Sequence, residues 1–595
     1  MSRYAGSASV RADGWPPRLG AIVERGGTTF RAWTTRARRV AVRILDGQQR
    51  PTCVQELQPR GGGIFETHVP SLGAGTLYKF LLDDREVPDP YARYLPFGVH
   101  GAAEVIAPAH ASALRPAPML ERLCTYELHV GTFTPEGTYE AARAKLNHIA
   151  ELGIGAVELM PLSAFPGERG WGYDGVAHYA PHASYGRPED LRRFLGDAHE
   201  LGLFVLLDVV FNHFGPNGNY LPSFSPEYFT RAFTTPWGDA LDFAEPHMRA
   251  YVLGAAHMWL EEYGFDGLRL DATHAIFDGS KPHVLRELAD LAASLDPPRL
   301  LVAEDDRNES SLVTELGLDA VWADDFHHHL WVLMTGEQDG YYAAYEPAAA
   351  ALAHAIERGW SYEGQHYSPW GRPRGTRADA FRPEQFVYCI ENHDQAGNRA
   401  FGERLSQKVS PGAFCAASAL LFFLPMSPLV FMGQEWGAST PFLYFTQHDA
   451  ELGALVSKGR REEFKSFRAF SDPDARARIP DPQAPATFET SKLRWQERLG
   501  PPHARVFAMV RKLLSLRRED PVLRERCERK DLRARAEADV IVVERSGGGG
   551  RRVLLANLTP RPVGIAWQSF GESIFATEDM AAGSLPPWCA TILKA

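Results

Sequence analysis

The stretch Gly264-Phe265-Asp266-Gly267-Leu268-Arg269-Leu270-Asp271-Ala272-Thr273-His274 contains a short apolar run that ends in charged and polar residues. A period of two predicts a β-strand that places Arg269 and Asp271 on the same side. A guanidinium beside a carboxyl group lowers the pKa of that group and keeps it ionised, as a nucleophile requires. A purely structural Arg–Asp pair explains the same residues about equally well. The stretch therefore predicts a strand whose end is either reactive or structural.

Three more acids follow apolar runs elsewhere in the chain. Asp208 follows residues 203–207, Glu304 follows residues 300–303, and Asp394 lies a few residues after the run 386–390. Each acid by itself is explained by a helix cap or a solvated loop. Four acids in this order at strand ends are much harder to obtain by chance. Because parallel barrels build their active centres at the carboxyl ends of the strands, we expect the four acids to converge.

From about residue 119, short apolar strands alternate with amphipathic helices, which indicates parallel strands joined by helical crossovers. Eight strand candidates favour a closed barrel over an open doubly wound sheet. No Gly-x-Gly-x-x-Gly motif follows the first strand, which argues against dinucleotide binding. We therefore expect an α/β fold with a (β/α)8 TIM barrel. The candidate strands are Thr125–Val130, Ala156–Met160, Leu203–Asp208, Gly267–Leu270, Leu300–Ala303, Ala320–Trp322, Phe386–Ile390 and Leu429–Phe431.

Both ends of the chain have the patterns of β structure. Period-2 runs around Val40–Leu45 and Tyr78–Leu82, separated by glycine-rich turns, predict an N-terminal β-sandwich. The Ala- and Pro-rich run Ala109–Pro118 is a plausible linker. Two late strands joined across Gly547–Gly550 predict a C-terminal antiparallel β domain. The expected domains are residues 1–114, the barrel 115–522 and residues 523–595.

Composition narrows the class of partner and compartment. The 595 residues carry a net charge of −11, which argues against a nucleic-acid partner. The longest apolar stretch, residues 416–430, is interrupted by Ser and Pro and is too short to span a bilayer, so no membrane partner is expected. The six cysteines are scattered and form no CxxC pair, and residues 1–6 lack the apolar core of a signal peptide. We expect a cytoplasmic protein.

Cleavage of a glycosidic bond needs one carboxylic acid to protonate the leaving oxygen and a second carboxylate as nucleophile or base. The chain offers these groups in blocks that resemble the four signature regions of the α-amylase superfamily of retaining glycosidases. Residues 160–162 followed by residues 171–176 resemble the family's loops after strand two, and Met432-Gly433-Gln434-Glu435 resembles the end of its eighth strand. The four blocks are residues 208–213, 264–274, 303–307 and 391–395.

The resemblance implies a role for each acid. Asp271 is the nucleophile, Glu304 is the general acid and then the base, and Asp394 stabilises the transition state. Arg269 orients Asp271, and Asp208 is a structural acid that positions Arg269.

The resemblance also implies which side chains bind the sugar at the cleavage point. Tyr173 would stack under the sugar ring, and His213 and His393 would donate hydrogen bonds to it. His274, in the same block as Asp271, is expected among the substrate-binding residues. The chemistry requires neither a metal nor a cofactor.

Further stretches resemble one branch of the superfamily, the maltooligosyltrehalose trehalohydrolases. This resemblance implies hydrolysis of the α-1,4 bond next to the terminal trehalose of maltooligosyltrehalose. It also implies a monomer that acts after a maltooligosyltrehalose synthase. Two departures from the branch are His329 and the pair Gln447-His448. The stretches are residues 322–328, 333–337, 340–342, 444–446, 452–464 and 480–489.

The segment Asp324–His328 is the candidate for recognising the trehalose end, through Asp324, Asp325 and His328, because it follows strand six at the same mouth. A metal site or a solvated acidic loop explains the same residues. Neighbouring histidines point in different directions, which disfavours the metal. An α-1,4-glucan branching or debranching enzyme is the close alternative function. A catalytically silent glucan-binding protein is disfavoured because all three catalytic acids are present.

Overall fold

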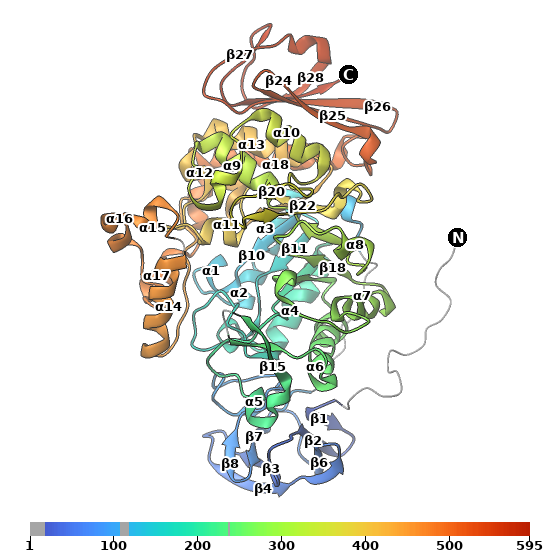
Figure 1. Cartoon of the computed structure of the whole chain (residues 1–595), viewed down its shortest axis with the longest axis vertical. Helices are drawn as coiled ribbons and strands as arrows, with labels where there is room; N and C mark the ends of the chain where they lie inside the picture. Colours follow the sequence, from blue (N-terminus) through green and yellow to red (C-terminus); the bar gives the residue numbers. More distant parts are fainter. Residues whose placement is uncertain (1–17, 108–117, 236–237, 464) are drawn as a thin grey trace.

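The computed structural model describes residues 18–107, 118–235, 238–463 and 465–595. Figure 1 shows an N-terminal β-sandwich at one end, a central barrel, and a C-terminal sheet at the other end. This is the expected fold class. The expected boundary at residue 114 lies among residues 108–117, which fall outside the described part of the chain.

The central barrel is closed by eight parallel strands that pair in the order of the chain. The ends of every predicted barrel strand agree with the structure to within two residues. The short apolar runs thus predicted the barrel strands correctly. The register pairs Asp208 with Arg269, and this brings the first acid beside the arginine of the next strand. The strands are β10 (Thr125–Leu128), β11 (Ala156–Leu159), β14 (Phe204–Val209), β17 (Gly267–Leu270), β18 (Leu300–Ala303), β19 (Ala320–Trp322), β22 (Phe386–Cys389) and β23 (Ser427–Phe431).

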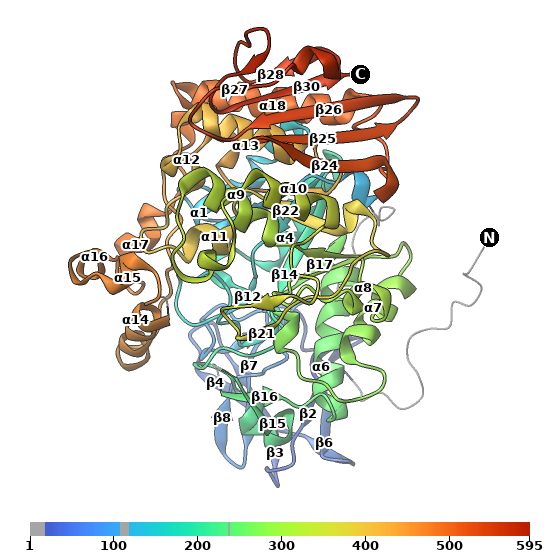
Figure 2. The same ribbon diagram turned by 45° about the horizontal axis from the view of Figure 1, so that its top comes forward.

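Helices follow most of the strands and cover the barrel. A helix that is apolar on all sides must be covered on all sides, and α13 is buried almost throughout. It lies between the barrel and the C-terminal sheet (Figure 2). Among the described residues no helix is both long and apolar enough to cross a membrane. The main helices are α3 (Leu146–Leu152), α4 (Pro188–Glu200), α6 (Pro246–His257), α7 (Val284–Ser294), α9 (Asp325–Thr335), α10 (Ala349–Arg358), α13 (Pro411–Phe423) and α18 (His503–Glu519).

The N-terminal sandwich consists of two antiparallel sheets with the strand orders β1-β2-β6-β5 and β4-β3-β7-β8. Its apolar core continues into the barrel side, where Phe224 packs against Phe80. The Thr34 hydroxyl donates a hydrogen bond to the carbonyl of Phe224, and Arg93 makes two hydrogen bonds to Glu262. The sandwich is therefore fixed to the barrel. Its strands are β1 (Gly20–Glu24), β2 (Gly27–Trp33), β3 (Val40–Leu45), β4 (Pro51–Glu56), β5 (Gln58–Gly61), β6 (Ile64–Pro70), β7 (Leu77–Leu82) and β8 (Arg85–Val87).

The C-terminal sheet has the strand order β24-β25-β26-β30-β28 and packs on α10 and α13. Gly548 and Gly549 form the predicted turn, and their positive φ angles of 51° and 76° favour glycine there. The buried Arg545 donates to the carbonyl of Phe423 at the end of α13, which links sheet and barrel. The strands are β24 (Leu532–Glu537), β25 (Val540–Gly547), β26 (Gly550–Asn557), β28 (Glu572–Ala576) and β30 (Cys589–Lys594).

Candidate active site

The predicted acids meet at the carboxyl ends of the barrel strands, around Arg269. This side chain is fully buried, and its guanidinium lies 4.3 Å from the centre of the Trp322 ring. Its Nη1 donates to both oxygens of Asp208, at 2.9 and 2.8 Å, and to Oδ1 of Asp271 at 2.7 Å. Its Nη2 lies 3.7 Å from Oε2 of Glu304. One cation therefore holds three of the four acids together.

Asp271 is held in the ionised form by Arg269 and Asn212. Its side chain is 14% exposed, and its Oδ2 accepts a hydrogen bond of 2.8 Å from the amide of Asn212. Burial raises the pKa of Asp271, but Arg269 and the bond from Asn212 outweigh burial and leave the pKa below its usual value. The site thus contains a carboxylate that is ionised, oriented and accessible.

Glu304 has the opposite character. Burial, with the nearby charges of Asp271 and Asp394, raises the pKa of Glu304 well above its usual value despite the attraction of Arg269. Its Oε2 accepts a hydrogen bond of 2.6 Å from the backbone N–H of Ala272. Ala272 has φ = 41°, a left-handed conformation that is strained for alanine, and such strain concentrates at functional sites. Two neighbouring carboxyls with pKa values pushed apart are suited to acid and nucleophile roles.

Asp394 lies at the start of α11 (His393–Gly397) and is the most exposed of these acids, at 38%. Its Oδ1 accepts a hydrogen bond of 3.2 Å from the Asn398 amide and lies 3.5 Å from Nε2 of His393. The carboxylate therefore faces the mouth of the barrel, next to the other acids.

His393 is held between two acidic groups and Tyr173. Its Nδ1 donates to Glu127, and its Nε2 lies 2.7 Å from the Tyr173 hydroxyl, which in turn donates to Asp208 at 2.6 Å. Burial lowers the pKa of His393, but Asp394 and Glu127 outweigh burial and raise it to about 9. The Tyr173 and His393 rings are nearly parallel, 5.2 Å apart. His393 is thus a fixed cation in the mouth.

His213 is buried beside these groups, and both of its ring nitrogens already have protein partners. Nε2 lies 2.9 Å from the Tyr173 carbonyl, and Nδ1 contacts the side-chain oxygen of Asn212. In this arrangement His213 fixes Asn212, which holds Asp271. A direct hydrogen bond from His213 to the sugar stays a prediction.

Two acids inside the barrel were not singled out from the sequence. Glu127 on β10 and Glu158 on β11 are paired in register and are both buried. Burial, with the charges of Glu127 and Asp208, raises the pKa of Glu158 well above its usual value. Glu127 instead accepts bonds from the backbone N–H and the ring of His393. The sequence did contain a sign of these two acids, because each one interrupts an otherwise apolar strand.

The residues expected to bind the trehalose end differ in exposure: Asp324 is partly exposed, whereas Asp325 and His328 are buried. Asp324 precedes α9 and is partly exposed; burial and the charge of Asp394 raise its pKa to about 6. Asp325 is fully buried and is bound by Arg374 at 2.9 Å and by the Tyr345 hydroxyl at 2.7 Å. These bonds connect Asp325, at the start of α9, to Arg374 and Tyr345 below the mouth of the barrel.

His328 is 8% exposed and is surrounded by tyrosine rings, the nearest being Tyr345 at 4.7 Å. Its Nδ1 has no hydrogen-bond partner within the described residues. Burial and the neighbouring His327 lower the pKa of His328 well below its usual value, so the ring is neutral.

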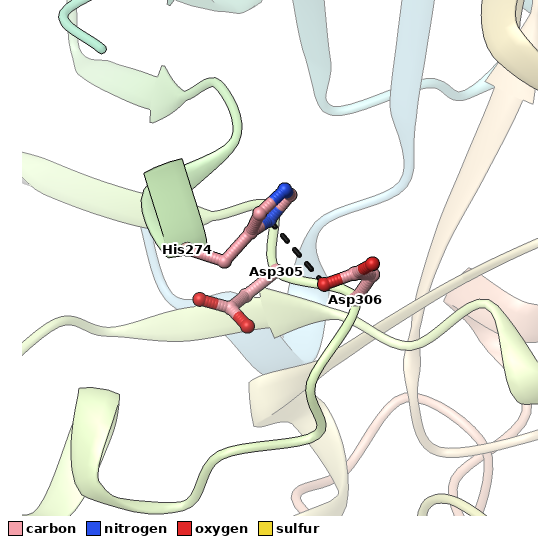
Figure 3. A group of neighbouring side chains, drawn as sticks. All are labelled: His274, Asp305 and Asp306. Carbon is pink, nitrogen blue, oxygen red and sulfur yellow. Dashed lines mark ion pairs between the residues drawn. The ribbon is translucent and has the colours of Figure 1, made fainter. Parts of the chain in front are cut away.

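His274, Asp305 and Asp306 form a cluster whose ligand atoms lie within 4.8 Å of one another (Figure 3). His274 and Asp306 face each other, with Nδ1 and Oδ1 3.4 Å apart. Both oxygens of Asp305, however, already accept hydrogen bonds from Arg307, and Thr273 adds another. Because Arg307 supplies the positive charge there, the cluster does not fit a metal ion.

Comparison with known proteins agrees with this geometry. Residues 124–223 match the family "Alpha amylase, catalytic domain", and residues 18–92 match "Carbohydrate-binding module 48 (Isoamylase N-terminal domain)". Residues 527–592 match a domain of unknown function, DUF3459.

Several relatives that are similar over most of their length carry the same name. A malto-oligosyltrehalose trehalohydrolase of Deinococcus radiodurans is 53% identical over 91% of this chain and 89% of its own. One of a Rhizobium species is 40% identical over 88% and 90%. A crystal structure of a Salmonella typhimurium protein assigned to the alpha amylases has a TM-score of 0.88 and 37% identity, covering 97% of this chain and 99% of that one. The chain therefore belongs to the malto-oligosyltrehalose trehalohydrolase family, within the α-amylase superfamily.

Proposed function

We propose that the protein hydrolyses the α-1,4-glucosidic bond next to the terminal trehalose of maltooligosyltrehalose and releases free trehalose. The observation that carries the chemistry is the pair Asp271 and Glu304, whose pKa values lie on opposite sides of the ordinary carboxyl value. Family membership supports the substrate.

In the first step, Glu304 donates its proton to the glycosidic oxygen while an oxygen of Asp271 attacks the anomeric carbon. The carbon–oxygen bond breaks, trehalose leaves as an alcohol, and a glucosyl ester forms on Asp271. Contact of both carboxyls with Arg269, at 2.7 and 3.7 Å, supports the short separation that a retaining mechanism needs.

In the second step, the Glu304 carboxylate takes a proton from a water molecule, whose oxygen attacks the same carbon. The ester bond breaks, Asp271 returns to its carboxylate form, and the shortened maltooligosaccharide leaves. The negative charge of Asp394 lies where the oxocarbenium character develops, so it lowers the barrier of both steps. His393 and Tyr173 bind the hydroxyls and face of the reacting ring.

On the leaving-group side we propose that Asp324 and His328 bind the trehalose unit. Asp324 is partly exposed and its carboxylate makes no hydrogen bond or ion pair to the described residues, and the Nδ1 of His328 is also unpaired there. Asp325 and Arg374 hold the start of α9 in place. His274 at the rim is a further candidate contact.

Product analysis tests the proposal directly. Maltooligosyltrehalose should yield trehalose and a shortened glucan, whereas plain amylose should yield no trehalose. Glu304→Gln and Asp271→Asn should each lower kcat at least about 10³-fold, because the two groups act as one unit. The control Glu315→Gln, an exposed glutamate on the same crossover, should keep wild-type turnover. A new branch point as the main product, or near-wild-type turnover in either variant, would refute the assignment.

We further propose that the protein is a cytoplasmic monomer supplied by an enzyme that builds the trehalose linkage at the reducing end of a glucan. All six cysteines are unpaired, which suits a reducing compartment. The large apolar side chains exposed on the described surface are mostly scattered, which suits a monomer. Light scattering at micromolar concentration should give the mass of one chain.

A further inference from the structure

An open pocket of about 490 Å³ lies where three separate parts of the molecule meet, a volume within the range of ligand sites. His100 comes from the segment that follows β8, and residues 216–220 come from the loop after β14. The remaining residues are Asp449, directly before α14 (Ala450–Glu463), and residues of the first two turns of that helix. The proposed hydrolytic steps use none of these residues.

The pocket has the chemistry of a binding site for a neutral polyol. The Tyr220 hydroxyl lies 2.7 Å from Nδ1 of His100, which fixes the tyrosine ring at the wall. Amide and carboxylate groups are added by Asn217, Asn219, Asp449 and Glu451. None of the described lining residues is a lysine or an arginine, so the pocket does not favour an anion.

An apolar surface completes the pocket. Leu452 and Leu455 of α14 also line it, and Leu455 is 60% exposed. Sugar rings have polar edges and apolar C–H faces, so aromatic and aliphatic walls next to amides and carboxylates suit them.

A continuous set of contacts joins the pocket to the catalytic mouth. Asn217 donates a hydrogen bond of 3.0 Å to Asp449, and the preceding residue, His448, lies 3.4 Å from Asp174. Asp174 directly follows Tyr173, whose hydroxyl reaches Asp208 and His393. The pocket therefore lies on the side of the mouth where the loops after strands two, three and eight meet.

This side is opposite the expected trehalose side. The trehalose candidates follow β19, the sixth strand of the closed barrel, and β11, the second strand, is its diametric partner in a ring of eight. A glucan with its trehalose end over the sixth strand extends its other end across the second strand, toward the pocket.

We infer that this pocket is a distal subsite that binds the non-reducing part of long α-1,4-glucan chains. The inference rests on the proposed function and adds to it a preference for chain length. A short substrate ends before the pocket, whereas a long one reaches Tyr220 and Leu455 and gains binding energy there.

A chain-length series tests the subsite. KM and kcat are measured with maltooligosyltrehaloses that carry from one to about ten glucose units beyond trehalose. Tyr220→Ala and Leu455→Ser should raise KM for the long substrates about three- to tenfold, with kcat unchanged, because stacking and apolar contacts of this size contribute that much. KM for the shortest substrate should not change. Leu499→Ser, at a leucine that is 66% exposed elsewhere, is the matched control.

A direct binding measurement separates the two proposals. In the Glu304→Gln background, calorimetry should show weaker binding of maltoheptaose, but not of maltotriose, when Tyr220 is replaced by alanine. If the wild-type protein releases no trehalose, the proposed function fails while this binding difference stands. If trehalose is released but KM changes equally at every length, or not at all, the distal subsite is refuted.

Discussion

Asp394 and the buried Glu127 together keep His393 positively charged, and Glu127 is the one that binds its ring directly. It accepts hydrogen bonds from the backbone N–H, at 3.0 Å, and from Nδ1 of His393, and it is 1% exposed. With Asp394 it keeps the imidazole protonated up to a pH of about 9. Because both ring nitrogens then carry a proton, Nε2 is a donor, and Tyr173 can accept from it while donating to Asp208.

Replacing Glu127 by glutamine should make the enzyme sensitive to alkaline pH. The amide cannot stabilise the imidazolium as the carboxylate does, so the pKa of His393 should fall toward its ordinary value. The ratio of variant to wild-type kcat/KM should therefore decrease as pH rises from 6 to 8.5. NMR titration of the His393 ring provides the independent check, and Glu136→Gln, at an exposed position, is the control. Parallel pH profiles would show that Glu127 has no such role.

The sequence predicted the acids that end apolar runs and missed those inside them. Asp271 and Glu304 each follow a completed strand, so they stand out from the apolar run before them. Glu127 and Glu158 instead interrupt the runs Thr125–Leu128 and Ala156–Leu159, where the dominant apolar pattern concealed them. Their partners also come from distant strands, and no local pattern reports such contacts.

At the scale of elements, helix α14 supports an acid that is far away in sequence. Arg460 donates to the side-chain oxygen of Asn398 and to the carbonyl of Gly397, both at 2.8 Å. Asn398 in turn donates to Asp394. The guanidinium also lies 4.6 Å from the centre of the Tyr444 ring. A helix from the loop after the eighth strand thus fixes the acid of the seventh.

Loss of this support should affect turnover more than stability. Arg460→Ala should lower kcat about ten- to hundredfold, because small displacements of a reacting group are costly, while KM and the melting temperature change little. Arg460→Lys should restore part of the rate. Arg461→Ala, at the next arginine of the same helix, makes none of these contacts and should behave as wild type. Equal kcat values for the two alanine variants would contradict the role of Arg460.

At the scale of the whole molecule, the order of sandwich, barrel and C-terminal sheet was predictable from the sequence. The hydrophobic pattern is that of strands alone at both ends of the chain, and that of alternating strands and helices in the middle. The sequence did not predict the pocket that forms where His100, residues 216–220 and the start of α14 come together. Each of these parts is more than a hundred residues from the next, and their contact depends on how the sandwich packs against the barrel. From the sequence, the stretch 452–464, which covers most of α14, was noted only for its resemblance to the trehalohydrolases, with no contact to the other two parts predicted.

The barrel also buries several histidines, which should make its stability depend on pH. Burial lowers the pKa of His129, His178, His182 and His327 to about 3 each. A depressed pKa means that the unfolded state takes up protons before the folded state does, so each histidine stabilises the fold above its ordinary pKa and less as pH falls. Buried acids with raised pKa values, such as Asp324 at about 6, act in the opposite direction.

A single histidine substitution separates the contribution of the histidines to pH-dependent stability from the opposing contribution of the buried acids. His182 stacks on Phe165 with ring centres 3.6 Å apart, so His182→Phe retains a ring there. Between pH 7.5 and 5.5 the wild-type protein should lose about 1.4 kcal/mol more unfolding free energy than the variant, because His182 stays neutral only when folded. Urea unfolding at the two pH values measures the difference, and His354→Phe, at an exposed site on α10, is the control. An identical loss in both proteins would argue that His182 is not desolvated.

The guanidinium shared by Asp208, Asp271 and Glu304 gives the two half-reactions a fixed order. Before cleavage, the charge of Asp271 helps to keep Glu304 protonated, so Glu304 is ready only to give a proton. Once the sugar is attached, Asp271 is a neutral ester, and this repulsion disappears while Arg269 remains. The pKa of Glu304 must then fall, so the group becomes ready only to take a proton. Each bond made or broken at Asp271 therefore changes the proton affinity of Glu304, while the positive charge of Arg269 stays in place beside both groups.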